Sequence, residues 1–189
     1  EAFGKAGVCK AICSWKGIDV AVWKNNCKSQ ALVHNSKIQV KVLEEALLMG
    51  NPSSFPRNVS QFLGFSHDSC ALFLVMKYYS NETLEQFLML PGRLNKTKIA
   101  LDIARGMAWL HENNIVHRDL TPSNVVITPE NTVVISGYSF SEEVLDKKFL
   151  EQKRVADINS SYYLAPEVII NNQTSKESDV YAYAVILVA

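Results

Sequence analysis

The sequence predicts an α+β fold with two lobes, the first rich in strands and the second rich in helices. Short β-branched runs dominate the beginning of the chain, whereas apolar residues recur at helical spacing after it. The pattern changes at about residues 77–80, and 189 residues are enough for two small lobes. We therefore expect one lobe over residues 1–78 and another over residues 79–189, with a ligand cleft between them.

The first lobe is expected to hold a small sheet and one helix. Strands are expected over residues 20–23, 59–65 and 71–79, the last two joined by a polar turn. Residues 36–49 carry apolar side chains at helical spacing, with Glu44 and Glu45 among them, and predict the helix.

The second lobe is expected to be mainly helical. Helices are expected over residues 81–90, over residues 95–112 and from about Asp179. Residues 125–127 and 133–135 flank the turn-forming stretch 128–132, so they predict a β-hairpin. Residues 136–163 are polar and irregular, and predict a loop.

One uninterrupted run in the second lobe carries the chemistry. Residues 117–126 read HRDLTPSNVV. The run resembles the catalytic loop of the protein kinases, HRDLxxxN, with every specified position filled. The resemblance implies three catalytic residues. Asp119 would deprotonate the substrate hydroxyl, and Asn124 would be a metal ligand that holds Mg²⁺. Arg118 matches the family's arginine that often pairs with a phosphate on the activation segment; the simpler alternative is that the hydroxyl residues 160–163 lie unmodified in a solvated loop.

The resemblance covers nearly the whole chain and is closest to the tyrosine-kinase-like group. The similarity to that group is greatest in three stretches, residues 15–22, 61–64 and 102–111. Residues 163–167, YLAPE, match the motif that ends the activation segment, and Asp179 matches an aspartate that braces the backbone of the catalytic loop. His117 is expected to be a buried packing residue.

The same alignment implies a nucleotide-binding site. Met76 would be the gatekeeper behind an adenine pocket, and Tyr78 would lie in the hinge, residues 77–79. Glu45 is the first choice for the glutamate of the family's regulatory helix, and Glu44 is the second. The other nucleotide-binding positions are Val8, Ala21, Val126 and Lys24. Taken singly, each side chain is more often ordinary core, so the assignment depends on their joint order.

The first departure from the family lies at its chief metal ligand. Thirteen residues after Asn124, where the family has Asp-Phe-Gly, this chain has Gly137-Tyr138-Ser139. Glycine has no side-chain oxygen, and the nearest carboxylate in the sequence is Glu142. Because neutralising phosphate charge is most of what such an enzyme does, the change predicts weak or absent phosphoryl transfer.

Two further departures lie in the first lobe. The family's VAIK reads VAVW at residues 20–23, and Lys24 comes one position late. Side chains alternate along a strand, so we expect Lys24 to point away from the face of Ala21, unless a β-bulge re-aims it. Trp23 would then stand where the phosphates normally sit, or pack against the neighbouring helix. The glycine-rich loop also departs from GxGxxG spacing.

Three functional interpretations follow. The first is a pseudokinase with a scaffolding or allosteric signalling role. The second is an active Ser/Thr protein kinase with Asp119 as catalytic base and with ATP and Mg²⁺ as cofactors. The third is a gene fragment that does not fold alone, because the apolar helix after Asp179 stops at Ala189 and leaves the second lobe incomplete.

Composition argues against several other classes. The 19 Lys and Arg residues balance 19 Asp and Glu residues, so no charge excess indicates nucleic-acid binding. The longest apolar run, residues 180–189, is too short to span a membrane, and we expect no signal peptide from the first residues given. The four cysteines lack CxxC spacing and are expected to be reduced. We therefore expect a cytoplasmic protein whose partner or substrate is another protein.

Overall fold

The computed structural model describes residues 2–3, 8–26, 56–67, 71–79, 82–89, 95–138, 161–171 and 173–188. These residues form two units, a β-sheet unit and a mainly helical unit, and each is described by itself. The expected α+β class, with a strand-rich and a helix-rich lobe, is confirmed. Residues 56–59 group with the helical unit, so the division is not a single cut in the chain. The helix expected over residues 36–49, with Glu44 and Glu45, lies outside the described residues.

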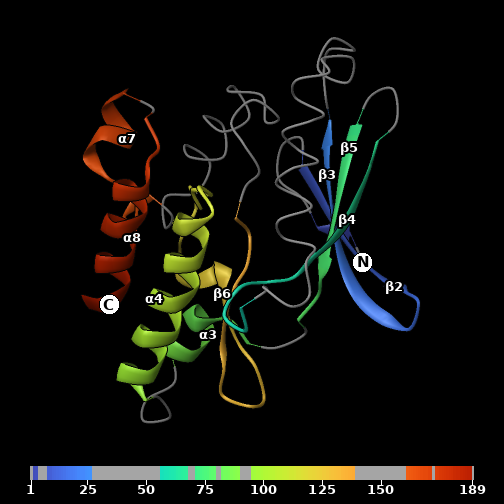
Figure 1. Ribbon diagram of the computed structural model, residues 1–189, viewed down its shortest axis with the longest axis horizontal. Coiled ribbons are helices and arrows are strands. Elements are labelled where there is room, and N and C mark those ends of the chain that lie inside the picture. The colour runs from blue at the N-terminus through green and yellow to red at the C-terminus, as the bar shows by residue number, and fades with distance from the viewer. Residues whose placement is uncertain are drawn as a thin grey trace. The chain divides into compact units, whose positions relative to one another are not determined.

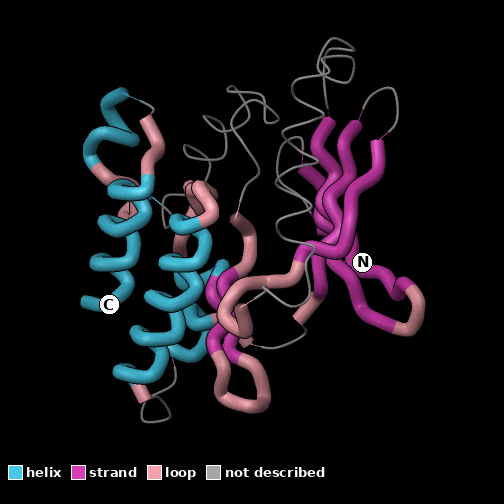
Figure 2. The backbone as a smooth tube through the Cα atoms, viewed as in Figure 1, coloured by secondary structure: helices cyan, strands magenta, loops and turns pink. Residues whose placement is uncertain are grey.

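The first unit is an antiparallel sheet with the strand order β1-β2-β3-β5-β4 (Figures 1 and 2). Its strands are β1 (Ala2–Phe3), β2 (Val8–Trp15), β3 (Ile18–Asn26), β4 (Phe62–His67) and β5 (Ala71–Lys77). The strands expected at residues 20–23 and 71–79 are confirmed within β3 and β5. The strand expected at residues 59–65 begins later, at Phe62, and its register with β5 shifts between Phe62 and Gly64.

A tight turn at Lys16 and Gly17 joins β2 to β3. Their φ angles are 50° and 76°. Positive φ at both central residues gives the hairpin turn that matches the twist of paired strands, and glycine adopts it without steric cost. The turn therefore sets the register of β2 on β3, although the mixed sequence of β2, VCKAICSW, has no alternation that predicts a strand.

Strand β3 pairs without interruption with its neighbours on both sides. Residues 18–25 are in register with β2, and residues 20–26 are in register with β5. The bulge considered for Lys24 is therefore absent, and position 24 alternates in the pleat with position 23. Val20 and Ala21 are both buried, so β3 is covered on both faces where these residues lie.

The helices that the structure describes lie in the second unit (Figure 1). They are α3 (Leu84–Leu88), α4 (Lys96–Glu112), the short 3₁₀ turn η1 (Pro122–Asn124), α7 (Pro166–Asn171) and α8 (Lys176–Val188). Helix α4 confirms the prediction over residues 95–112, with Asn95 as its N-cap. Helix α3 is shorter than expected because a capping box between Thr83 and Gln86 starts it late. None of the described helices has the length and apolar character needed to cross a membrane.

Helices α4 and α8 pack against each other, and the hydroxyl of Tyr183 donates to the carbonyl of Ala100 at 3.0 Å. Helix α8 begins at Lys176, almost one turn before the position expected from the sequence. That start brings Asp179 into its first turn, where its carboxylate can reach the segment that follows α4.

The predicted hairpin is confirmed as β6 (Val125–Ile127) and β7 (Val133–Ile135), and all of its strand residues are buried. Asn58 anchors it, because its carbonyl accepts the Ile135 N–H at 2.8 Å and its Nδ2 donates to the Val133 carbonyl at 2.9 Å. Helix α4 approaches closely at Gly106, where a Cβ would lie 2.7 Å from the Asn58 carbonyl oxygen. The hairpin thus fixes the chain directly after Asn124.

Candidate active site

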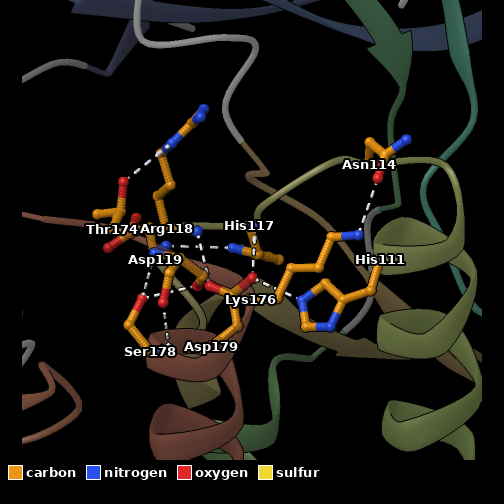
Figure 3. A network of polar contacts seen from close by, with 10 residues as sticks. His111, Asn114, His117, Arg118, Asp119, Thr174, Lys176, Ser178 and Asp179 are labelled. Carbon is orange, nitrogen blue, oxygen red and sulfur yellow. Dashed lines mark hydrogen bonds and ion pairs between the residues drawn. The ribbon is translucent and has the colours of Figure 1, made fainter.

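Figure 3 shows the polar network around Asp179, which is almost fully buried. Oδ2 of Asp179 accepts the His117 N–H at 2.7 Å, and Oδ1 accepts the Arg118 N–H at 2.9 Å. Nε2 of His111, at the end of α4, lies 2.9 Å from Oδ2. The expected bracing of the catalytic-loop backbone by Asp179 is therefore confirmed.

Arg118 has a left-handed backbone conformation, with φ of 69°. Such a conformation is uncommon for residues other than glycine and persists where surrounding contacts fix it. Besides its backbone bond to Asp179, Arg118 donates from Nε to Oγ1 of Thr174 at 3.3 Å (Figure 3). Thr174 precedes α8, whose first turn is fixed by reciprocal bonds between Ser175 and Ser178. The start of α8 therefore directs both the backbone and the side chain of Arg118.

His117 is fully buried, as predicted, but it does more than pack. Nδ1 accepts the Asp119 N–H at 3.2 Å, so Nε2 carries the proton that it donates to the Ser136 carbonyl at 3.0 Å. Its ring meets Tyr138 edge to face, with centroids 6.4 Å apart. The pKa of Tyr138 is raised above its usual range, mainly because the phenol is buried and to a smaller extent because the phenol of Tyr79 lies nearby. His117 thus links the catalytic loop to the segment after β7.

The side chains of Asp119 and Asn124 face each other. Nδ2 of Asn124 donates to the Asp119 backbone carbonyl at 2.7 Å and to Oδ2 at 2.9 Å. The Asn124 backbone is fixed as well, because its carbonyl accepts from the N–H of Ser136 at 2.8 Å and from its Oγ at 3.1 Å. Asn124 therefore joins the loop to the strand end that leads to residue 137.

Gly137 has a φ of 75° and lies against the Asn124 amide. A Cβ at this position would be 2.6 Å from Oδ1 of Asn124 and 2.8 Å from its Cγ. Contacts under 3.0 Å are essentially never made by real Cβ atoms, so the amide occupies space that any other residue at 137 would need.

Comparison with known proteins assigns the chain to a family. The pattern described as "Protein tyrosine and serine/threonine kinase" matches residues 2–188. The chain belongs to the protein kinase family. It is 33% identical over 192 residues to "Serine/threonine-protein kinase 12" of Arabidopsis thaliana, a match that covers 97% of this chain and 39% of that protein. It is 31% identical over 137 residues to "Dual specificity testis-specific protein kinase 1" of Homo sapiens, covering 69% of this chain and 22% of that protein. The kinase chain therefore spans well under half the length of these curated relatives.

The residues at the loop do not fit the magnesium site of a protein kinase. Mg²⁺ requires oxygen ligands in octahedral geometry. Gly137 offers no side-chain oxygen, and Oδ1 of Asn124 is turned towards the backbone of Gly137. Within the part of the chain that the structure describes, no cluster of three His, Cys, Asp or Glu side chains could hold a metal ion.

The structure brings together two of the nucleotide-binding residues expected in this kinase. Ala21 in β3 and Met76 in β5 are directly paired across the sheet, and both are buried. Tyr78 follows β5, and its N–H donates to the Asp19 carbonyl at 3.0 Å. The remaining positions are Val8 in β2, Lys24 in β3, Val126 in β6 of the helical unit, and Glu45, which lies outside the described residues.

A small cavity adjoins Asp119 in the helical unit of the kinase. Its lining includes Asp119, Thr121, Tyr163 and Ser178. Its volume of about 20 Å³ has room for roughly one water molecule and excludes a nucleotide. Burial, and then the Glu85 carboxylate, raises the pKa of Tyr163. The cavity lies between the catalytic loop and the YLAPE segment.

The sequence assigns no individual role to two residues of the site, His111 and Ser136. His111 is 68 residues from the Asp179 carboxylate that it contacts. Ser136 contributes through its backbone N–H and carbonyl and through its Oγ, and a single serine at the end of a strand forms no recognisable sequence pattern. Their roles follow only from the packing of α4, α8 and β7.

Proposed function

We propose that this kinase domain transfers phosphate weakly or not at all and acts as a scaffolding or allosteric signalling domain, that is, as a pseudokinase. The observation that carries the proposal is Gly137 at the position of the family's metal-binding aspartate, with the Asn124 amide packed against it. The chain then lacks the family's chief ligand for the Mg²⁺ ion that neutralises the phosphate charge. Removing one preorganised electrostatic group typically lowers the rate by roughly 10²–10³.

The strand that carries the phosphate-anchoring position supports the same proposal. Trp23 occupies the place of the lysine in VAIK, and Lys24 follows it. Because the ladder of β3 is continuous on both sides, Lys24 does not take the register position of Trp23. If the two losses act independently, their effects multiply to roughly 10⁴ or more in rate.

A second candidate function is an active Ser/Thr or dual-specificity protein kinase. It is favoured by the intact catalytic loop, in which Asp119 is braced through Asp179 and held by Asn124. In this case Asp119 would be the base that takes the proton of a protein hydroxyl, with Arg118 pairing a phosphate, and ATP and Mg²⁺ would be required. The nucleotide would contact Val8, Ala21, Lys24, Glu45, Met76, Tyr78 and Val126.

Transfer of radiolabelled phosphate by the full-length protein distinguishes the two candidates. We expect no transfer to generic Ser, Thr or Tyr substrates above the level of the Asp119→Asn variant. Protein kinases turn over at roughly 1–100 s⁻¹. A turnover of roughly 1 s⁻¹ that is lost in Asp119→Asn would establish the second candidate and exclude the first.

A thermal-shift titration with ATP tests the metal site separately. We expect that any stabilisation by ATP is unchanged by Mg²⁺, because the described ligands do not form a magnesium site. A shift that grows with Mg²⁺ and disappears in Asn124→Ala would contradict this expectation.

We further propose that the domain acts on or through another protein, and that it does so in the cytoplasm. The balanced charge and the absence of a membrane-crossing helix among the described residues are consistent with a protein partner. Affinity purification of the tagged full-length protein tests for a bound protein partner, and cell fractionation tests the location. The absence of any co-purifying protein would contradict the first point, and recovery mainly with membranes would contradict the second.

A further inference from the structure

We infer that Gly137 and Asn124 act as a coupled pair that positions Asp119. The glycine leaves the room that the Asn124 amide occupies, and the amide in turn holds the Asp119 carboxylate. The inference rests on the proposed function only for the role of Asp119, since the contacts themselves are properties of the folded loop.

The Asn124 amide nitrogen has two protons, and the loop uses both. Nδ2 donates to the Asp119 backbone carbonyl at 2.7 Å and to the Asp119 carboxylate at 2.9 Å. Because the amide is planar, these two bonds fix the direction of Oδ1, which lies on the other side. Oδ1 is directed at Gly137, 2.6 Å from where a Cβ would be.

The backbone of Asn124 is held on both sides of its side chain. Its N–H donates to the Thr121 carbonyl at 3.0 Å, within the turn η1. Its carbonyl accepts from the N–H and the Oγ of Ser136 at 2.8 and 3.1 Å. Asn124 therefore cannot move away from residue 137 without breaking its bonds to Asp119 or to Ser136.

A second path joins the same residues through His117. The Ser136 carbonyl accepts from Nε2 of His117 at 3.0 Å, and Nδ1 of His117 accepts the Asp119 N–H at 3.2 Å. The contacts from Asp119 through Asn124, Ser136 and His117 back to Asp119 thus close a ring. A displacement of the amide at Gly137 changes the environment of Asp119 directly.

The ring also bears on the missing metal ligand. Aspartate at 137, which is the residue of the family, has a Cβ that would collide with the Asn124 amide. The Gly137→Asp substitution alone therefore displaces the Asn124 side chain, so the new carboxylate does not simply add a ligand to the existing site. To restore a metal ligand at residue 137, the Asn124 amide would therefore have to change its position as well.

A double-mutant cycle on the full-length protein tests the coupling. Gly137→Ala is measured in the native background and in Asn124→Ala. The strain of alanine at positive φ is present in both backgrounds and cancels, so the cycle isolates the contact. We expect Gly137→Ala to lower the folding equilibrium constant about tenfold more when Asn124 is present. Equal losses in the two backgrounds would overturn the inference.

Gly17→Ala is a matched control, because Gly17 has a φ of 76° and no atom within 4 Å of an added Cβ. It measures the cost of the left-handed conformation alone. We expect Gly137→Ala in the Asn124→Ala background to approach the Gly17→Ala loss. If Gly137→Ala and the double variant both fail to fold while Asn124→Ala folds, the inference is wrong.

NMR of the unmodified protein gives a test that does not depend on the folding of any variant. We expect the side-chain amide protons of Asn124 to exchange slowly and to show contacts with the Hα protons of Gly137. In a second NMR test, made on the folded variants, the ¹³C resonance of the Asp119 carboxyl is expected to shift in Gly137→Ala and not in Gly17→Ala, a response that a merely structural role of Gly137 does not require. Fast exchange of these amide protons, without contacts to Gly137, would refute the pairing.

Discussion

Asp179 holds Arg118 in a backbone conformation that arginine seldom adopts. Its Oδ1 accepts the Arg118 N–H at 2.9 Å, and the φ of Arg118 is 69°. The other carboxylate oxygen accepts the N–H of His117, so one side chain fixes two consecutive peptide groups. Because such a conformation persists only where the surroundings over-determine it, the first turn of α8 shapes the loop that presents Asp119.

Replacement of Asp179 is expected to destabilise the domain strongly. Asp179→Ala leaves one buried and one part-buried N–H group without their acceptor and should lower the free energy of unfolding by about 3 kcal/mol. Asp179→Asn keeps one acceptor oxygen and should lower it by less. Urea unfolding of both variants measures the difference. Glu177→Gln, an exposed change in the same helical turn, is the control, and a loss in this control equal to that of Asp179→Ala would contradict the bracing role.

Gly106→Ala should destabilise the domain although alanine favours helices. The added Cβ would lie 2.7 Å from the Asn58 carbonyl oxygen and from Cδ1 of Ile135. Overpacking of this kind costs about 1–3 kcal/mol, which exceeds the gain of about 1 kcal/mol in helix propensity. Ala108→Gly, on an exposed position of α4, calibrates the propensity by thermal unfolding. An increase in stability for Gly106→Ala would show that α4 does not approach Asn58 this closely.

Tyr138 should make the domain less stable in alkaline solution. Burial, and then Tyr79, raises the pKa of the folded Tyr138, whereas an unfolded tyrosine titrates near about 10. Above about pH 10 the unfolded chain therefore binds fewer protons than the folded one, and the free energy of unfolding falls as pH rises. Tyr138→Phe should flatten this fall in denaturant titrations between pH 9 and 11. An equal flattening by Tyr162→Phe, whose side chain is exposed, would refute the assignment.

The N-cap of α4 should contribute measurably to stability. Oδ1 of Asn95 accepts the Lys98 N–H at 3.0 Å. Asn95→Ala should lower the free energy of unfolding by about 1 kcal/mol, whereas Asn95→Ser should change it by a few tenths, because serine also caps well. Chemical denaturation of the two variants decides the point, and indistinguishable midpoints would mean that α4 does not depend on this cap.

Elements in which apolar residues recur at a regular spacing were predictable from the sequence. Helix α4 and the β6–β7 hairpin follow directly from apolar spacing and turn residues. Strand β2 was not predictable in this way, because Lys10 interrupts its apolar run and its pairing is set by the turn at Lys16 and Gly17. Helix α7 covers only Pro166–Asn171, which is too short to show a helical period.

The candidate site was predictable where its residues are neighbours in the chain. The spacing of Asp119 and Asn124 within one loop predicts that their side chains lie together. The bond between His111 and Asp179 depends on how α4 and α8 pack, which no local pattern specifies. The sequence shows that Gly137 lacks the side-chain oxygen of the family's aspartate. The space that Gly137 leaves for Asn124 appears only in three dimensions.

The continuous ladder of β3 limits the ways in which a lysine could be brought to the strand face of Ala21. Sliding the strand by one residue would break its pairing with β2 and β5 together and exchange the buried positions of Val20 and Ala21. A substitution at residue 23 itself changes none of this pairing, so it is the change that would place a lysine on that face while leaving the backbone of β3 as it is.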